Sequence, residues 1–190
     1  MQVTVAIIPP RHVLDDVEAV LSRTPAPAGE FDRVARGALM IPVFSLGNVT
    51  RPDAVAVADL LRGGLDRSNP APQVRLAGVW ALESDGDPTI GLPLAGEVER
   101  LDDLTRDLWT LVASRGYFVD RRRWATRLTV GSVTETTSLP YLEQLVADLG
   151  GHTSAAWPVS SISFVRRRFD ADDRQAWDLI DEVPTSDEDA

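Results

Sequence analysis

The stretch WATRLTVGSV, residues 124–133, decides the fold, because it is typical of a short apolar strand that ends at Gly131. Alternation along the strand puts Arg127 and Thr129 on one face. The stretch MIPVFSLGNV, residues 40–49, has the same order of an apolar strand, a glycine, one further residue and a valine. A turn and a helix follow each stretch, and the two lie about half the chain apart. Unrelated strand–turn–helix units also look alike, but the repeated pattern indicates an internal duplication into two lobes.

The other secondary-structure elements follow from apolar periodicity. Alternating or continuous apolar runs predict strands over residues 2–8, 38–46, 73–83, 89–94 and 159–167. Apolar residues at helical spacing predict helices over residues 12–23, 50–62, 102–114 and 138–149. Thr50 is the expected N-cap of the second helix, with Asp53 at its third position. Pro93 lacks a backbone N–H and therefore indicates that 89–94 is an edge strand, paired as a hairpin with the strand before it.

The composition is that of a soluble globular protein, since 44% of its 190 residues are hydrophobic and 25% are charged. No apolar run reaches the roughly 20 residues of a membrane span. The start, MQVTVAIIPP, lacks the basic leader of a signal peptide and fits a first strand. The absence of cysteine excludes disulfides and fits a protein of the reducing cytoplasm. We expect the protein to be a monomer. The two histidines, His12 and His152, lie far apart and predict no metal site.

Charge is distributed unevenly along the chain. The net charge is −10, and all 19 basic residues are arginine. Residues 170–190 hold nine of the 29 acidic residues and one arginine, whereas residues 1–169 are almost neutral. We therefore expect a folded unit over 1–169 and an acidic C-terminal segment over 170–190, helical around Trp177 and Ile180 and then disordered. The acidic segment is a candidate docking surface for a protein partner.

The two strands and their flanks resemble the 2H phosphoesterase superfamily, in particular its 2′-5′ RNA ligase-like branch. In that family the chain opens with a strand like VTVAIIPP (residues 3–10), and a helix follows. Each lobe contributes a strand with the motif His-x-Thr-x, here at MIPVFSLGNV and WATRLTVGSV, and SISFVRR (161–167) looks like the closing strand. The resemblance implies an α+β, bilobal fold over 1–169: two pseudo-symmetric lobes of mainly antiparallel sheet with outer helices around a central cleft.

Both catalytic histidines of the family are replaced in this sequence. In the family, one histidine acts as general base and the other as general acid on a phosphodiester, while the neighbouring hydroxyls hold phosphate oxygens. The first motif here has Met40 and Pro42, which offer neither a titrating group nor a hydroxyl. The second has Arg127, which stays protonated at any working pH, and it retains Thr129. The resemblance therefore implies no catalytic residue of the two-histidine type, and the sequence leans against an enzyme.

What remains of the motif suits anion binding. A guanidinium beside a threonine hydroxyl can grip a phosphate, so we expect a phosphate site formed by Arg127 and Thr129, with Arg11 at the mouth of the cleft. The candidate RNA contacts are Arg121, Arg122 and Arg123. The simpler interpretations are that Arg127 is a solvent-facing strand arginine and that the arginine run lies in a solvated loop.

Three functions remain open at this point. The first is a catalytically degenerate protein that binds a nucleotide or an RNA phosphate in the cleft without a cofactor. The second is an active phosphodiesterase with a rebuilt site that recruits His12 or a carboxylate. The third is a protein-interaction module with a vestigial cleft. The arginine run 166–168 fits ion pairing with the acidic segment, and Trp80, Trp109 and Trp124 fit a place in the core.

Overall fold

The computed structural model describes residues 1–81, 86–121, 124–169 and 175–187. The elements in chain order are β1 (Gln2–Ile7), α1 (Arg11–Leu21), β2 (Phe31–Arg33), the short 3₁₀ helix η1 (Arg36–Ala38), β3 (Ile41–Asn48), α2 (Arg51–Gly64), β4 (Gln73–Leu76), β5 (Trp80–Ala81), β6 (Thr89–Gly96), α3 (Val98–Ser114), β7 (Arg127–Val133), α4 (Leu139–Gly150), β8 (Trp157–Pro158), β9 (Ser161–Phe169) and β10 (Gln175–Pro184). Within the part of the chain that the structure describes, no helix combines the length and the apolar character needed to cross a membrane.

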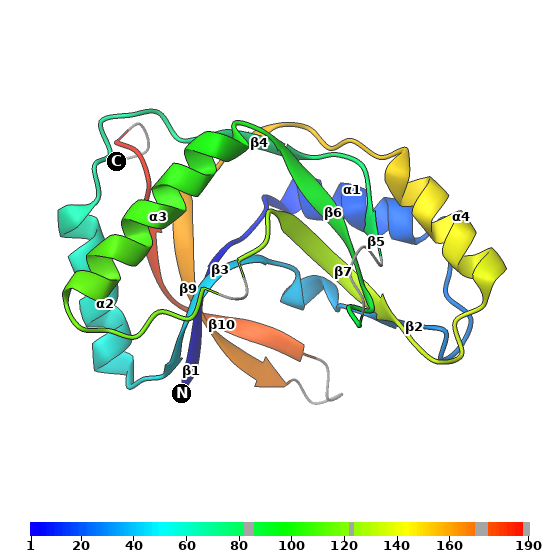
Figure 1. Cartoon of the computed structure of the whole chain (residues 1–190), viewed down its shortest axis with the longest axis horizontal. Coiled ribbons are helices and arrows are strands. Elements are labelled where there is room, and N and C mark those ends of the chain that lie inside the picture. Colours follow the sequence, from blue (N-terminus) through cyan, green and yellow to red (C-terminus); the bar gives the residue numbers. More distant parts are fainter. Residues whose placement is uncertain (82–85, 122–123, 170–174, 188–190) are drawn as a thin grey trace.

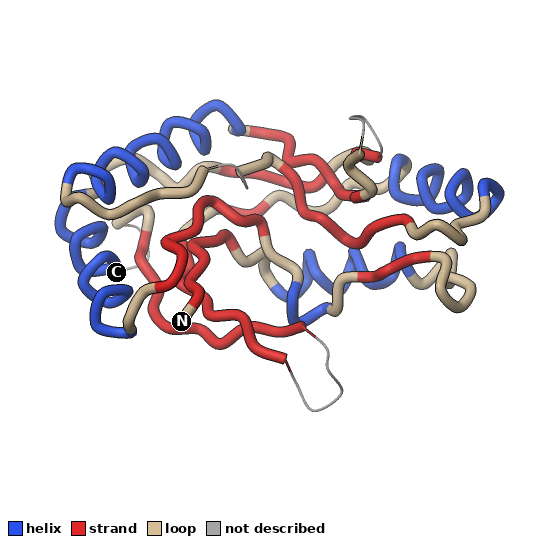
Figure 2. Tube along the Cα trace, turned by 60° about the horizontal axis from the view of Figure 1, so that its bottom comes forward, coloured by secondary structure: helices blue, strands red, loops and turns tan. Residues whose placement is uncertain are grey.

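The strands form two antiparallel sheets that lie between the helices (Figure 1). The first sheet has the strand order β10-β9-β1-β3, and the second has the order β2-β7-β6-β4-β8, with β5 added beside β6. The helices α2 and α3 lie at one end of the molecule and α1 and α4 at the other, and the tube view shows the strands between them (Figure 2). The expected α+β architecture of antiparallel sheets with outer helices is confirmed.

The helix α2 begins as the sequence predicts. Thr50 Oγ1 accepts a hydrogen bond from the backbone N–H of Asp53 at 3.3 Å, and Asp53 Oδ2 accepts one from the backbone N–H of Thr50 at 3.2 Å. This reciprocal capping box satisfies N–H groups that would otherwise lack partners at the helix start. Pro52 fits the first turn because no helical hydrogen bond is lost there.

The first sheet has one face covered by α2. Across β10, β9, β1 and β3, the residues Asp181, Phe164, Val5 and Phe44 stand opposite one another, so their side chains share a face. Asp181 forms an ion pair with Arg62 of α2, which identifies this face as the one under α2. The three apolar side chains are fully buried there. Their neighbours along each strand point to the opposite face.

The second sheet has one face covered by α1 and α4. Arg33 of β2 stands opposite Gly131 of β7 and forms an ion pair with Glu18 of α1 at 2.6 Å. Phe31 lies two residues earlier on the same face and contacts Tyr141 of α4, with the ring centroids 6.1 Å apart.

β6 is an internal strand, so the expected edge position of 89–94 is wrong. β6 pairs with β7 on one side and with β4 and β5 on the other. Pro93 is tolerated because it stands beside the interruption between β4 and β5, where the ladder of hydrogen bonds is already broken. Its carbonyl still accepts a hydrogen bond from the backbone N–H of Ala77 at 3.0 Å. The expected strand over residues 73–83 is therefore divided into two short strands, β4 and β5, within the described residues.

The acidic C-terminal segment continues as a strand, and the expected helix around Trp177 and Ile180 is wrong. β10 pairs with β9 along its whole length, as the outermost strand of the first sheet. A β-bulge at Ile180 interrupts the alternation, so Trp177 and Ile180 acquire a three-residue spacing that resembles a helical pattern. The expected boundary at 169/170 stays a prediction. Of the disorder expected after Ile180, residues 188–190 lie outside the described residues, whereas Thr185 and Ser186, directly after β10, are buried.

Candidate functional site

Arg127 and Thr129 lie on the face of β7 that points away from α1 and α4. In the pairing of β6 with β7, Arg127 stands opposite Pro93 and Thr129 stands opposite Gly91. The intervening Leu128 is fully buried on the helix-covered face, whereas Arg127 and Thr129 are half-buried. The shared face that alternation predicts for the two residues is therefore confirmed.

Pro42 lies on the face of the first sheet that points away from α2. It stands opposite Ala6 of β1, which stands opposite Ser163 of β9, whereas the neighbouring Val5 belongs to the α2 face. Met40 comes directly before β3 and, like Pro42, is half-buried. Neither Met40 nor Pro42 offers a group that gains or loses a proton.

The two sheets meet at β3 and β7, which are in contact. The chain before β7 also bridges to the edge of β3: the backbone N–H of Ser45 donates to Asp120 O at 3.1 Å, and the N–H of Asp120 donates to Ser45 O at 3.0 Å. Val34, which lies between β2 and β3, also binds β7: its backbone N–H donates to Val130 O at 2.9 Å. The fold thus brings the two motif strands together from distant parts of the sequence.

The guanidinium of Arg127 is held by two contacts within the second sheet. Its Cζ lies 3.5 Å from the centre of the Trp80 ring, and its Nη2 lies 3.3 Å from Asp87 Oδ2. Its Nε is buried and has no hydrogen-bond partner among the described residues. The side chain keeps 24% of its surface exposed. Arg127 is therefore not a freely solvated strand arginine, and its donors are not all used.

Gly91 makes the contact between Arg127 and Trp80 possible. In the second sheet, Gly91 of β6 stands between Trp80 of β5 and Thr129 of β7. Because glycine has no side chain, the long Arg127 side chain crosses above β6 and reaches the indole ring. A Cβ at position 91 would come within 2.9 Å of the Leu128 carbonyl oxygen, so the close approach of the strands also requires glycine.

Asp87 supplies a carboxylate next to Arg127. Its pKa lies below the ordinary value, chiefly because Oδ1 accepts hydrogen bonds from Thr89, at 2.7 Å from Oγ1 and at 2.9 Å from the backbone N–H. The positive charge of Arg127 lowers this pKa further. Both effects favour the ionised carboxylate. At neutral pH the local charge of Arg127 is therefore balanced by an anion of the same chain.

The lowered pKa of Asp87 predicts a pH-dependent contribution to stability. The contribution is fully present above the unfolded-state pKa of about 3.9 and is lost as the pH falls through the lower folded-state pKa. We expect Asp87→Asn to lower the free energy of unfolding at pH 7 by up to about 1 kcal/mol, and the difference from wild type to shrink at acid pH. Urea unfolding at neutral and acid pH measures this difference. A difference of the same size at every pH would contradict the assignment.

The predicted RNA contacts are placed only in part. Arg121 is exposed, and its Cζ lies 5.3 Å from the centre of the Trp109 ring. Arg122 and Arg123 lie outside the described residues. Trp109 makes an edge-on contact with Trp124, with the ring centroids 6.5 Å apart, and both pack partly buried against the core. The role of the arginine run in RNA binding stays a prediction.

Arg11 and the two histidines lie around α1. Arg11 and His12 begin α1; Arg11 is 90% exposed and lies 3.8 Å from a carboxylate one turn later on the helix. His152 follows α4. Burial lowers its pKa; the charge of Asp16 on α1 raises it, and the charge of Arg23, just after α1, lowers it. Its described contacts are to the backbone of Gly78 and Leu149, and none joins it to Arg127. The place of Arg11 at a phosphate site stays a prediction.

The arginine run at the end of β9 pairs with β10. Arg166 forms an ion pair with Asp178, and Nε of Arg168 lies 3.0 Å from Asp178 Oδ1. Arg167 stands opposite Trp177 on the other face of this strand pair. The expected charge match between this run and the acidic segment is confirmed for Arg166 and Arg168.

Arg75 is a cationic residue on the face of Arg127 that the sequence analysis missed. It stands opposite Ala95, two residues after Pro93 on β6, and Pro93 stands opposite Arg127. Arg75 is exposed and forms no ion pair with any described residue. Arg75 could have been found from the sequence of β4. It separates two apolar residues there, and this alternation predicts that it points to the opposite face from them.

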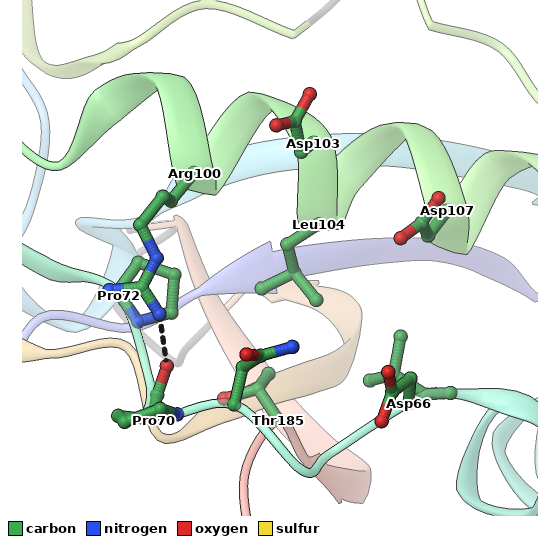
Figure 3. Close-up of a pocket in the computed structure, with 10 residues that line it drawn as sticks. Asp66, Pro70, Pro72, Arg100, Asp103, Leu104, Asp107 and Thr185 are labelled. Atoms are coloured by element: carbon green, nitrogen blue, oxygen red, sulfur yellow. Dashed lines mark hydrogen bonds between the residues drawn. The ribbon is translucent and has the colours of Figure 1, made fainter.

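One hollow, of about 270 Å³, lies between α3, the loop before β4 and the residue after β10 (Figure 3). Its lining includes Asp66, Asp103 and Asp107, and Arg100 at one end donates to the carbonyl of Pro70 at 2.7 Å. Carboxylates at this density repel a phosphate. Among the described residues, no group of three or more His, Asp or Glu side chains is placed to hold a metal ion.

A second hollow, of about 370 Å³, lies beside the end of α1 on the helix-covered side of β2. Phe31 and Tyr141 form its aromatic wall, and Arg33, its cation, already pairs with Glu18. Neither hollow includes a residue of the two motif positions. The expected central cleft therefore stays a prediction.

The sequence matches no family model and no curated protein. Solved structures do match the fold. The crystal structure of E. coli LigT complexed with 3′-AMP has a TM-score of 0.72 and 15% identity, over 96% of this chain and 97% of LigT. The protein TT0787 of Thermus thermophilus has a TM-score of 0.68 and 16% identity, over 99% of this chain and all of the other. A structure described as a phosphoesterase has a TM-score of 0.72 and 15% identity, over 97% and 98% of the two chains.

Further crystal structures of E. coli LigT that match contain ATP, NADP⁺ or phosphate. At this level of identity the likeness establishes the fold. The likeness spans nearly the whole chain, so the expected α+β fold is confirmed as the fold of E. coli LigT.

Proposed function

We propose that this protein binds the phosphate group of a nucleotide or of an RNA end through Arg127 and Thr129, without catalysing its transfer. The observation that carries the proposal is that the two side chains share the face of β7 that points away from α1 and α4, on the strand that contacts β3. The fold is that of E. coli LigT, whose crystal structures contain 3′-AMP, ATP, NADP⁺ or phosphate. A similar ligand on the same face of this chain is consistent with that fold.

The chemistry of the two residues suits a phosphate. A guanidinium offers planar pairs of N–H donors that match two oxygens of a phosphate, and a threonine hydroxyl donates to a third. Arg75 adds a second positive charge to the same face. These local charges support anion binding even though the whole chain carries a net charge of −10.

The residues at the motif positions argue against proton transfer. Met40 cannot act as an acid or a base, and Arg127 remains a cation at working pH. His152 follows α4, and no described contact joins it to Arg127. His12 is exposed on the first turn of α1, and no described contact joins it to the face of Arg127. A binding role without catalysis therefore agrees best with this arrangement.

Phosphorus NMR of the protein mixed with 3′-AMP, a 2′,3′-cyclic nucleotide or a short 2′-5′-linked oligonucleotide tests the proposal. We expect shifted or broadened ligand signals and no product signal. Arg127→Ala is expected to weaken binding about tenfold or more, because it removes charged hydrogen-bond donors. Arg106→Ala, on the exposed surface of α3, changes the net charge equally and is expected to leave binding unchanged.

The other outcomes identify the alternatives. A product signal that is absent without protein would overturn the binding-only proposal in favour of an active phosphodiesterase with a rebuilt site. Unchanged ligand signals at millimolar protein would instead favour an interaction module with a vestigial cleft. Circular dichroism of both variants shows that any loss of binding occurs in folded protein.

A further inference from the structure

Arg127 already pairs with an anion of its own chain, and this bears on the affinity of the proposed site. The contact joins one nitrogen to one oxygen at 3.3 Å, which is longer than the roughly 2.7–2.9 Å of a strong charge-assisted hydrogen bond. It is not the two-point pairing that an arginine forms with a well-placed carboxylate. Both side chains are also partly exposed, at 24% for Arg127 and 28% for Asp87. The pair is therefore weak enough for a ligand to displace.

Asp87 does not depend on Arg127 for its hydrogen bonds. Its Oδ1 accepts two hydrogen bonds from Thr89, so the carboxylate stays satisfied and in place when Arg127 changes partner. Arg127 in turn keeps its position without Asp87, because the guanidinium lies against the ring of Trp80. An exchange of partners on Arg127 thus needs no refolding of either residue's surroundings.

We infer that Asp87 occupies the position on Arg127 that a ligand phosphate takes, and that Asp87 thereby lowers the affinity of the site for anions. The inference rests on the proposed function. A phosphate must displace the carboxylate and then tolerate its negative charge a few ångströms away. Asp87 therefore weakens the binding of every anion at this position, while Trp80 holds the guanidinium in the orientation that receives the ligand.

Calorimetric titration with inorganic phosphate and with 3′-AMP tests the inference. Asp87→Asn removes the competing charge and keeps the size of the side chain, so we expect it to tighten the binding of both ligands about fivefold. Asp66→Asn is the matched control. The carboxylate of Asp66 accepts hydrogen bonds from Ser68 in the way that Asp87 accepts them from Thr89, but it lies by the hollow next to α3. We expect Asp66→Asn to leave both affinities unchanged.

A double substitution shows whether the effect passes through Arg127. In the Arg127→Ala background, Asp87→Asn is expected to have no effect on binding, because the guanidinium for which Asp87 and the phosphate compete is gone. Tightening of the same size in that background would overturn the inference and indicate a general effect of charge. Wild-type binding that requires Arg127 but is not tightened by Asp87→Asn would also overturn it, and would leave the proposed function standing. Absence of binding in wild type and in Asp87→Asn alike would overturn both.

Discussion

Replacing Phe164 with alanine is expected to lower the free energy of unfolding by about 4 kcal/mol. Phe164 is fully buried at the centre of the first sheet, where β9 lies between β1 and β10. It stands opposite Val5 and belongs to the face under α2. Removing the ring loses the free energy gained by burying it. It also leaves a cavity, which β9 cannot close because it is hydrogen-bonded to a strand on each side. The loss is therefore expected to exceed that of any other substitution proposed for this chain.

Urea unfolding followed by circular dichroism measures this loss, and the melting temperature should fall by roughly 10 °C. Phe118→Ala is the matched control, because Phe118 is 74% exposed and buries little surface. We expect its effect to stay within about 0.5 kcal/mol. Equal losses in the two variants would contradict the placement of Phe164 in the core.

Replacing Gly131 with alanine is expected to lower the free energy of unfolding by about 3 kcal/mol. The added Cβ would lie 2.7 Å from the carbonyl oxygen of Asp32, which is backbone of the neighbouring strand β2, and closer still to the ring of Phe31. The ring cannot turn away freely, because it packs against Tyr141 of α4. The substitution therefore pushes β2 off β7 and disturbs the contact between the second sheet and its helices.

Gly37→Ala serves as the control for Gly131→Ala. Gly37 lies in η1 with no atom within 4 Å of an added Cβ. We expect a change of less than about 0.5 kcal/mol there. Thermal unfolding of the two variants side by side gives the comparison, and a Gly131→Ala protein as stable as wild type would show that β2 does not lie against β7 as described.

The elements with long and regular patterns are the ones that could be predicted from sequence. α1 has five buried apolar residues at helical spacing, and α2 carries its own start signal in the Thr50–Asp53 capping box. Alternation predicts β7, and Arg127 and Thr129 do share a face of it. In each case the signal lies within about a dozen consecutive residues, so that no distant partner is needed to interpret it.

The errors fall where a distant partner decides the structure. Pro93 argues for an edge strand unless the interruption of the neighbouring strand is known. The bulge at Ile180 arises in pairing with β9 and hides the alternation of β10. β2 and β8 have three and two residues, too few for any periodicity to show. A pattern within one segment holds no information about such neighbours.

The candidate site divides in the same way. Arg127 and Thr129 could be singled out from their own strand, because alternation puts a cation and a hydroxyl together on one face. Arg75 could have been found by the same argument applied to β4. The partners of Arg127 could not, since Trp80 comes from β5 across Gly91, and Asp87 lies in the loop before β6, 40 residues away in the chain.

By itself, then, the sequence determined which segments form the two motif strands, that neither strand carries a histidine, and that an arginine and a threonine share a face of the second. Those properties follow from residue identity and from a period of two, both of which are local. Only the tertiary structure decided that β3 and β7 meet, that the acidic end is a strand of the first sheet, and that Arg127 lies between Trp80 and Asp87. The physical reason is that sheet pairing and ion pairing depend on distances between residues far apart in the chain, which no local pattern specifies.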